Sequence, residues 1–276
     1  MHLQRAVALP VWTVAILLIA ASAGAAAAPV PTEPVALVTE LAGTGSVAQK
    51  PHDGALEQLL ELWPGAVISL ARGARAVVVH TPTGSVYELA GPGRFRVRAS
   101  GVDALEGAKL AKRDLPPAIR SFQLKPLSTM QASIVMRGAP TLQLQGPDGG
   151  VLSGEELNYR VRGALATQSV ELIETEGATR STINGSGTAF NPASVATLQP
   201  GKHYRVLVRG TDSRGRATEL SARFWLIDTA AAARLTAARP GVDATLTELI
   251  VYAMALESAG ATASARAAWQ QVNERR

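Results

Sequence analysis

Between residues 35 and 102, short apolar runs rich in β-branched side chains alternate with turn residues. Pairs such as Pro64-Gly65 and Thr83-Gly84 separate the runs. Strands at this spacing, with no long helical period between them, indicate a compact all-β domain. For Ala55–Leu62 we predict one or two helical turns. The predicted strands are Val35–Leu41, Val67–Leu70, Ala76–His80, Val86–Leu89 and Phe95–Ala99.

The same alternation returns in residues 137–228, with turns at Asn184-Gly185 and Pro200-Gly201. It predicts a second β domain. Its strands are Leu142–Leu144, Leu157–Val161, Val170–Ile173, Tyr204–Val208 and Phe224–Ile227.

Residues 107–136 lie between the two β domains and contain fewer β-branched side chains, together with a Pro116-Pro117 pair. We interpret this segment as a basic linker that partly packs on its neighbours. Its basic residues are Lys109, Lys112, Arg113, Arg120 and Lys125.

Residues 229–276 follow a helical pattern instead. Thr229–Ala238 is rich in alanine and is stopped by Pro240-Gly241, and Thr245 with Glu248 has the spacing of a capping box. A further helix places Trp269 on an apolar seam, so the predicted unit is a helical hairpin. A single hairpin is too small to be stable alone, and we expect it to dock on the β domains or on a partner through Trp269.

The first residues show the three parts of a secretory signal peptide: Arg5 near the start, an apolar stretch, and an alanine-rich end. The strongly apolar part, Val11–Ala20, is shorter than a spanning helix. We therefore expect residues 1–27 to be cleaved, export to the periplasm, and no transmembrane segment in the mature chain. The alternative is an uncleaved membrane anchor.

The amino-acid composition limits which catalytic and metal-binding sites the chain can form. The chain has no cysteine, only four histidines and a net charge of +5, which is too mild an excess to indicate nucleic acid binding. The histidines do not have metal-ligand spacing, and we interpret His80 as a residue at the rim of its strand. We predict no catalytic residues, no metal and no cofactor, and hence a protein that is not an enzyme.

Three stretches follow one another in the first β domain, 28–106: Leu62-Trp63-Pro64-Gly65-Ala66-Val67-Ile68-Ser69-Leu70, Gly73-Ala74-Arg75-Ala76 and Tyr87-Glu88-Leu89-Ala90-Gly91-Pro92-Gly93-Arg94-Phe95-Arg96-Val97. Their order resembles the FecR-type periplasmic domain. The resemblance implies a small β fold in the periplasm that acts in sensing or envelope binding. Too few residues precede the apolar stretch to form the sigma-factor-binding domain of the family's sensors, so we do not expect that activity.

Two further resemblances concern the remaining parts. The run from Leu198 to Asp212 is similar to a late strand of immunoglobulin-like or fibronectin type III sandwiches, entered by Leu-x-Pro-Gly-x-x-Tyr and left by an Asp-x-x-Gly turn. The C-terminal hairpin resembles a single tetratricopeptide-type unit. The predicted fold is therefore mainly β: a small FecR-like domain, an immunoglobulin-like β-sandwich and a C-terminal helical hairpin.

Arg94, Arg96 and Arg98 alternate with apolar residues, which places the three guanidinium groups on one face of a strand. The face is either a solvated strand face or a sheet edge guarded by charge against aggregation, or it binds anionic envelope polymers. A weaker stripe of the same kind is formed by His203, Arg205 and Arg209. Trp63, Trp225 and Trp269 are core residues or, in the alternative, platforms for sugar rings.

These observations predict a periplasmic, non-enzymatic FecR-like protein that binds an envelope protein or an anionic envelope polymer. One alternative is a structural or assembly factor that recruits a protein partner through its helical tail. The other is an envelope hydrolase whose site the sequence does not reveal.

Overall fold

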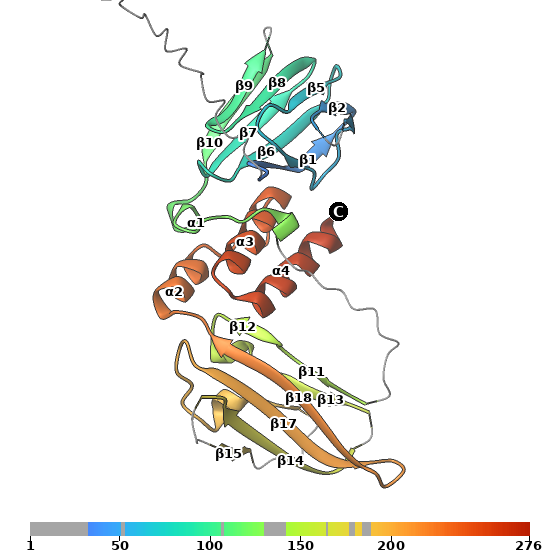
Figure 1. The fold of residues 1–276 in the computed structure, drawn as a ribbon, viewed down its shortest axis with the longest axis vertical. Coiled ribbons are helices and arrows are strands. Elements are labelled where there is room, and N and C mark those ends of the chain that lie inside the picture. The colour runs from blue at the N-terminus through green and yellow to red at the C-terminus, as the bar shows by residue number, and fades with distance from the viewer. Residues whose placement is uncertain are drawn as a thin grey trace, which may run out of the picture. The chain divides into compact units, whose positions relative to one another are not determined.

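The structure, a computed structural model, describes residues 33–50, 53–105, 108–129, 142–163, 165–176, 180–183 and 189–276. The predicted signal peptide and the predicted Asn184-Gly185 turn lie outside these residues. As predicted, the described chain is mainly β, with two β domains and a helical hairpin near its C-terminal end (Figure 1).

The N-terminal β domain consists of two sheets in which every neighbouring pair of strands is antiparallel. Side chains of the two inner faces form one core, because apolar residues occupy alternate positions on each strand. One sheet has the order β10 (Lys109–Asp114), β7 (Ser85–Ala90), β6 (Arg75–His80), β1 (Ala36–Ala42) and β4 (Glu61–Leu62). The other has the order β3 (Gly54–Ala55), β2 (Gly45–Ala48), β5 (Val67–Leu70), β8 (Gly93–Arg98) and β9 (Gly101–Leu105).

Gly91, which begins the Gly-Pro-Gly step between β7 and β8, is required by a close backbone approach. A Cβ atom at this position would lie 2.0 Å from the carbonyl oxygen of Ala71. Any side chain here would push apart the connections that join the two sheets.

The prediction of helical turns in Ala55–Leu62 is wrong. The segment leaves β3, makes a turn with Leu59 at φ 65° and enters β4. The amide of Leu56 donates to the carbonyl of Gly45, and that of Leu59 to the carbonyl of Val38. Hydrogen bonds to distant strands thus replace the local bonds of a helix.

Part of the segment predicted as a linker belongs to the first β domain. β10 pairs with β7 over its whole length, from Lys109 opposite Ala90 to Asp114 opposite Ser85. The remaining described part of the predicted linker contains the short helix α1 (Pro117–Arg120) and the 3-10 turn η1 (Leu127–Thr129). Ile119 of α1 is buried against the helical hairpin, so this part packs on its neighbours as predicted.

The second β domain is a sandwich of a three-stranded and a five-stranded sheet in its described part. Pairing is antiparallel except between β12 and β18, which run parallel. The three-stranded sheet is β11 (Gln143–Gln145), β13 (Tyr159–Arg162) and β16 (Ala189–Phe190). The five-stranded sheet is β12 (Gly149–Val151), β18 (Ala217–Leu226), β17 (His203–Asp212), β14 (Leu165–Glu174) and β15 (Arg180–Ile183). Two 3-10 turns complete it, η2 (Gly154–Glu156) and η3 (Pro192–Ser194).

Tyr204 and Asp212 anchor the two ends of β17. The buried Tyr204 hydroxyl accepts a hydrogen bond of 2.9 Å from the backbone amide of Gln199, as in the tyrosine corner of immunoglobulin-like sandwiches. At the other end, Asp212 accepts from the amides of Arg214 and Arg216, and Gly215 adopts the positive φ of 73° that the turn requires. Hydrogen bonds from Arg216 also lower the pKa of the Asp212 carboxyl.

Three helices follow the sandwich: α2 (Thr229–Ala237), α3 (Leu246–Ser258) and α4 (Thr262–Arg275). The predicted capping box at Thr245 and Glu248 is confirmed, and Gly260 adopts a φ of 78° after α3 ends. α3 is buried nearly all round, from Leu249 to Leu256. Its core includes Val79 and Val86 from the first domain and Ile227 from the sandwich, so the hairpin docks on both β domains.

Candidate functional site

The predicted arginine stripe lies on β8. The alternation is confirmed, because Phe95 and Val97 are fully buried while Arg94, Arg96 and Arg98 are exposed. β8 pairs with β5 on one side and β9 on the other. It is therefore an interior strand, and protection of a sheet edge does not account for its arginines.

Short side chains surround the stripe on the β5 side. Arg94 lies opposite Ser69 and Arg96 opposite Val67, and next to these on β2 are Ser46 and Ala48. Such residues leave the guanidinium groups standing above a low surface. This arrangement gives a broad ligand access to the Arg96 guanidinium.

On the β9 side, Asp103 forms an ion pair with the Arg98 guanidinium, and both side chains are about half exposed. A pair of this exposure contributes little stability. Arg96 has no ion-pair partner among the described residues. The sheet face therefore carries more positive than negative charge in its described part.

The second predicted stripe differs, because its arginines are neutralised within the sandwich. Arg209 pairs with Glu171 at 2.9 Å and with Glu219 at 3.2 Å, and Arg205 pairs with Glu219 at 3.3 Å. His203 lies against the ring of Trp225, with 5.2 Å between ring centroids. Arg205 and Arg209 are thus engaged with carboxylates of neighbouring strands.

The interpretation of His80 as a rim residue is wrong, because its side chain is fully buried. Its Nδ1 lies 2.8 Å from Thr83 Oγ1, and its Nε2 lies 2.9 Å from the carbonyl oxygen of Arg98. The second contact joins β6 of one sheet to the end of β8 in the other. Burial lowers the pKa of His80, the hydrogen bond to Arg98 raises it, and the charge of Lys112 lowers it.

Trp63, Trp225 and Trp269 are all partly buried. Trp225 and Trp269 pack against the core of the helical hairpin. The seam of α4 is completed by Ala265, Ala268 and Val272, which are more deeply buried than Trp269. Core packing thus accounts for Trp225 and Trp269 better than stacking on sugars does.

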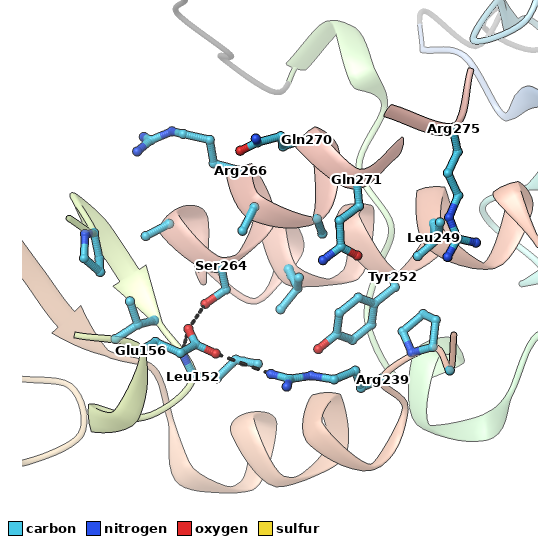
Figure 2. Close-up of a pocket in the computed structure, with 18 of the residues that line it drawn as sticks. Leu152, Glu156, Arg239, Leu249, Tyr252, Ser264, Arg266, Gln270, Gln271 and Arg275 are labelled. Atoms are coloured by element: carbon cyan, nitrogen blue, oxygen red, sulfur yellow. Dashed lines mark hydrogen bonds and ion pairs between the residues drawn. The ribbon is translucent and has the colours of Figure 1, made fainter. Parts of the chain in front are cut away.

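A cleft of about 770 Å³ opens where the sandwich meets the helices (Figure 2). Its walls are formed by η2, the loop between α2 and α3, and the facing sides of α3 and α4. Its polar lining residues are Glu156, Arg239, Tyr252, Ser264, Arg266, Gln270, Gln271 and Arg275. No motif in the sequence indicates this site, because its residues are far apart in the chain.

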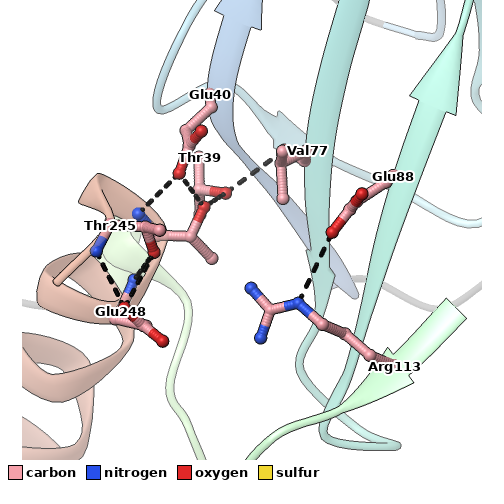
Figure 3. A network of polar contacts seen from close by, with 8 residues as sticks. Thr39, Glu40, Val77, Glu88, Arg113, Thr245 and Glu248 are labelled. Atoms are coloured by element: carbon pink, nitrogen blue, oxygen red, sulfur yellow. Dashed lines mark hydrogen bonds and ion pairs between the residues drawn. The ribbon is translucent and has the colours of Figure 1, made fainter. Parts of the chain in front are cut away.

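A polar network joins the N-terminus of α3 to β1 (Figure 3). Glu40 accepts hydrogen bonds from the Thr247 backbone amide at 2.9 Å and from the Thr247 hydroxyl at 2.6 Å. The Thr39 and Thr247 hydroxyls lie 2.8 Å apart. Glu40 thus caps a helix 207 residues later in the sequence and fixes the hairpin on the first domain.

No described helix has the length and apolar character needed to cross a bilayer. Within the described ranges, no three His, Asp or Glu side chains are grouped so that they could hold a metal ion. No model of a known protein family and no curated protein sequence matches the chain.

Proposed function

We propose that the chain is a periplasmic, non-enzymatic FecR-like protein that binds an anionic polymer of the cell envelope. The observation that carries this proposal is the exposed face of β8, where Arg94, Arg96 and Arg98 stand on an interior strand above short side chains. Along the strand these arginines are spaced by about 6.6 Å.

The chemistry of the face suits phosphate and carboxylate groups. A guanidinium group can donate two parallel hydrogen bonds to either anion. Each contact at an exposed site is weak, yet a polymer with repeated anionic groups engages several at once, which raises the overall affinity. On the sandwich, Arg205 and Arg209 of β17 are already paired with Glu171 and Glu219, so we assign this role to the first domain.

The test compares two triple variants with the same change in charge. Arg94→Gln, Arg96→Gln and Arg98→Gln together remove the stripe. The control replaces three exposed arginines of the sandwich by Gln: Arg160, Arg162 and Arg214. Both proteins should fold cooperatively, because surface substitutions usually change stability by about 0.5 kcal/mol or less each.

We expect the stripe variant to lose retention on lipopolysaccharide or peptidoglycan at low salt, and the control to be retained like the wild type. Wild-type retention should disappear near about 1 M salt, where the Debye length is about 3 Å. Equal loss in both variants would indicate a nonspecific effect of net charge. Unchanged retention in the stripe variant would refute the proposed role of the face.

One observation favours the alternative of an assembly factor with a protein partner. Val242, in the loop before α3, is 88% exposed, so a protein partner could cover it. Replacing Val242 by Asp should then abolish capture of a specific envelope protein without affecting polymer binding. Capture that survives Val242→Asp would remove the support for this alternative.

A further inference from the structure

The outer face of the sheet that contains β6, β7 and β10 is covered only in part by the helices. On this face, Leu37, Val79 and Val86 are buried in the core of the helical hairpin. Further along the same strands the face stays accessible, and a second cleft, of about 620 Å³, lies over it. Side chains two positions apart on a strand point to the same side, so the lining of this cleft follows from the register of the three strands.

Two cations line this cleft from either side of an alanine. Arg75 of β6 and Lys109 of β10 are both paired with Ala90 of β7, and all three residues line the cleft. Neighbouring strands are about 4.8 Å apart, so the backbones of the two cationic residues are about 10 Å apart. Only a methyl group stands between the two long side chains. An anion over Ala90 can therefore contact both of them.

Both cations are accessible and have no carboxylate partner. Arg75 and Lys109 are exposed, and neither forms an ion pair within the described ranges. Glu40 and Glu88 also line the cleft but already have partners, since Glu40 caps α3 and Glu88 pairs with Arg113 (Figure 3). Because two cations lie close together, they attract a doubly charged group more strongly than a singly charged one.

Glu88 supplies a hydrogen-bond acceptor beside the two cations. It precedes Ala90 by two residues, so its side chain is on the same face, about 6.6 Å along the strand. The side chain of Glu88 is 59% exposed, and its ion pair with Arg113, at 3.6 Å, uses only Oε1. The surrounding cations repel an ammonium group, whereas a neutral hydroxyl can donate to this carboxylate. The neighbours of Glu88 on β6 and β10, Val77 and Ala111, carry no polar group that would compete for the carboxylate.

We propose that this cleft binds a small phosphorylated sugar. The phosphate lies over Ala90 and accepts hydrogen bonds from Arg75 and Lys109, while a sugar hydroxyl donates to Glu88. The volume of about 620 Å³ is within the range of about 300–1,000 Å³ that is usual for small-molecule sites. The cleft lies on a different sheet from the arginine face of β8, so this proposal does not depend on the binding of envelope polymers.

The test uses the full chain and glucose 6-phosphate, with glucose 6-sulfate and glucose as matched probes. At about pH 7.5 the phosphate carries close to two negative charges, whereas the sulfate carries one. Titration followed by calorimetry or NMR should show saturable binding of the phosphate at concentrations up to about 10 mM. The sulfate should bind more weakly, and glucose should show no saturation in the same range.

Arg75→Gln and Lys109→Gln should each weaken binding of glucose 6-phosphate by about tenfold, as expected for a hydrogen bond between charged groups. Lys109→Arg should bind it like the wild type. The matched control is Lys112→Gln, which makes the same change in charge on the same strand. The Lys112 side chain lies on the other face of the sheet, over the ring of Tyr87, so this variant should also bind like the wild type.

Glu88→Ala separates recognition of the sugar from attraction of the charge. It should lower the preference for glucose 6-phosphate over inorganic phosphate, because it removes the acceptor for the sugar hydroxyl. The stripe variant described above should bind glucose 6-phosphate like the wild type, so that failure of the envelope proposal and failure of this one are distinguishable. Absence of saturable binding would overturn the proposal, as would equal effects of Lys109→Gln and Lys112→Gln. An unchanged preference in Glu88→Ala would refute recognition of the sugar.

Discussion

Both ring nitrogens of His80 have hydrogen-bond partners within the fold, the Thr83 hydroxyl and the Arg98 carbonyl. This arrangement lets a titratable side chain be buried between two sheets at little cost while it is neutral. The same contact ties the end of the arginine strand to β6. Protonation would put a positive charge in this buried position, near the cationic Lys112.

The consequence is a pH-dependent stability. The pKa of His80 is lowered on folding, so below its ordinary value of 6.5 the unfolded chain binds more protons than the folded chain. Stability should therefore fall as the pH decreases below about 6.5, with a slope of at most about 1.4 kcal/mol per pH unit from this residue. Urea unfolding followed at several pH values measures the slope.

His80→Gln provides the control for this prediction, because glutamine can hydrogen bond but does not titrate. We expect the variant to lose the pH dependence between about pH 6.5 and 5, even if its stability is lower overall. A wild-type slope that persists unchanged in His80→Gln would place the titrating group elsewhere.

Among the elements, the helical hairpin has an apolar seam between α3 and α4 whose side chains are buried to different degrees. The partly buried Trp269 shares the seam of α4 with the more deeply buried Ala265 and Val272, and α3 contributes the fully buried Leu256. Close approach of the two helices depends on the alanines. The largest side chain of the seam is therefore not its best packed one.

Trp269→Ala should accordingly cost less than the roughly 3–5 kcal/mol expected for a fully buried tryptophan. Leu256→Ala, at a fully buried position, should cost about 2–5 kcal/mol. Chemical denaturation of the two variants gives the ranking, and limited proteolysis reports whether the hairpin loosens before the β domains. A larger loss for Trp269→Ala than for Leu256→Ala would contradict this account of the seam.

The elements also show how far the sequence could be interpreted. Local signals sufficed for the capping box of α3 and for the alternation on β8, because both depend on residues a few positions apart. β4 and β10 form because they pair with strands distant in the sequence, and no local sequence pattern predicted either strand. The cleft between the sandwich and the helices was equally hidden, since its lining residues come together only in the assembled fold.

At the scale of the whole molecule, the contact between Glu40 and Thr247 joins the beginning of the described chain to its last hairpin. A second close approach occurs on the sandwich side, where a Cβ atom at Gly150 would lie 2.0 Å from the carbonyl oxygen of Gly260. The hairpin is thus fixed to both β domains by contacts that leave little room for substitution.

The variant Glu40→Ala tests the contact between the hairpin and the first β domain. It leaves the Thr247 amide without its acceptor, and we expect a loss of about 1–3 kcal/mol together with faster hydrogen exchange in the first turn of α3. Glu88→Ala is the matched control, because Glu88 forms only an exposed pair with Arg113 at 3.6 Å (Figure 3). It should change stability by about 1 kcal/mol or less. Equal effects of the two variants would show that the cap contributes nothing specific.

The helical core has a consequence for the order in which the chain can fold. Leu37, Val79 and Val86 belong to the first domain, but the helices that cover them are made last. While the chain is synthesised from its N-terminus, these side chains lack the packing that α3 provides until residues beyond 246 are available. Contacts across such a distance close slowly, because the entropy of a long loop is lost before they form. The early domain should therefore expose an apolar surface during biogenesis, and we expect truncations before α3 to aggregate even though every strand of that domain is present.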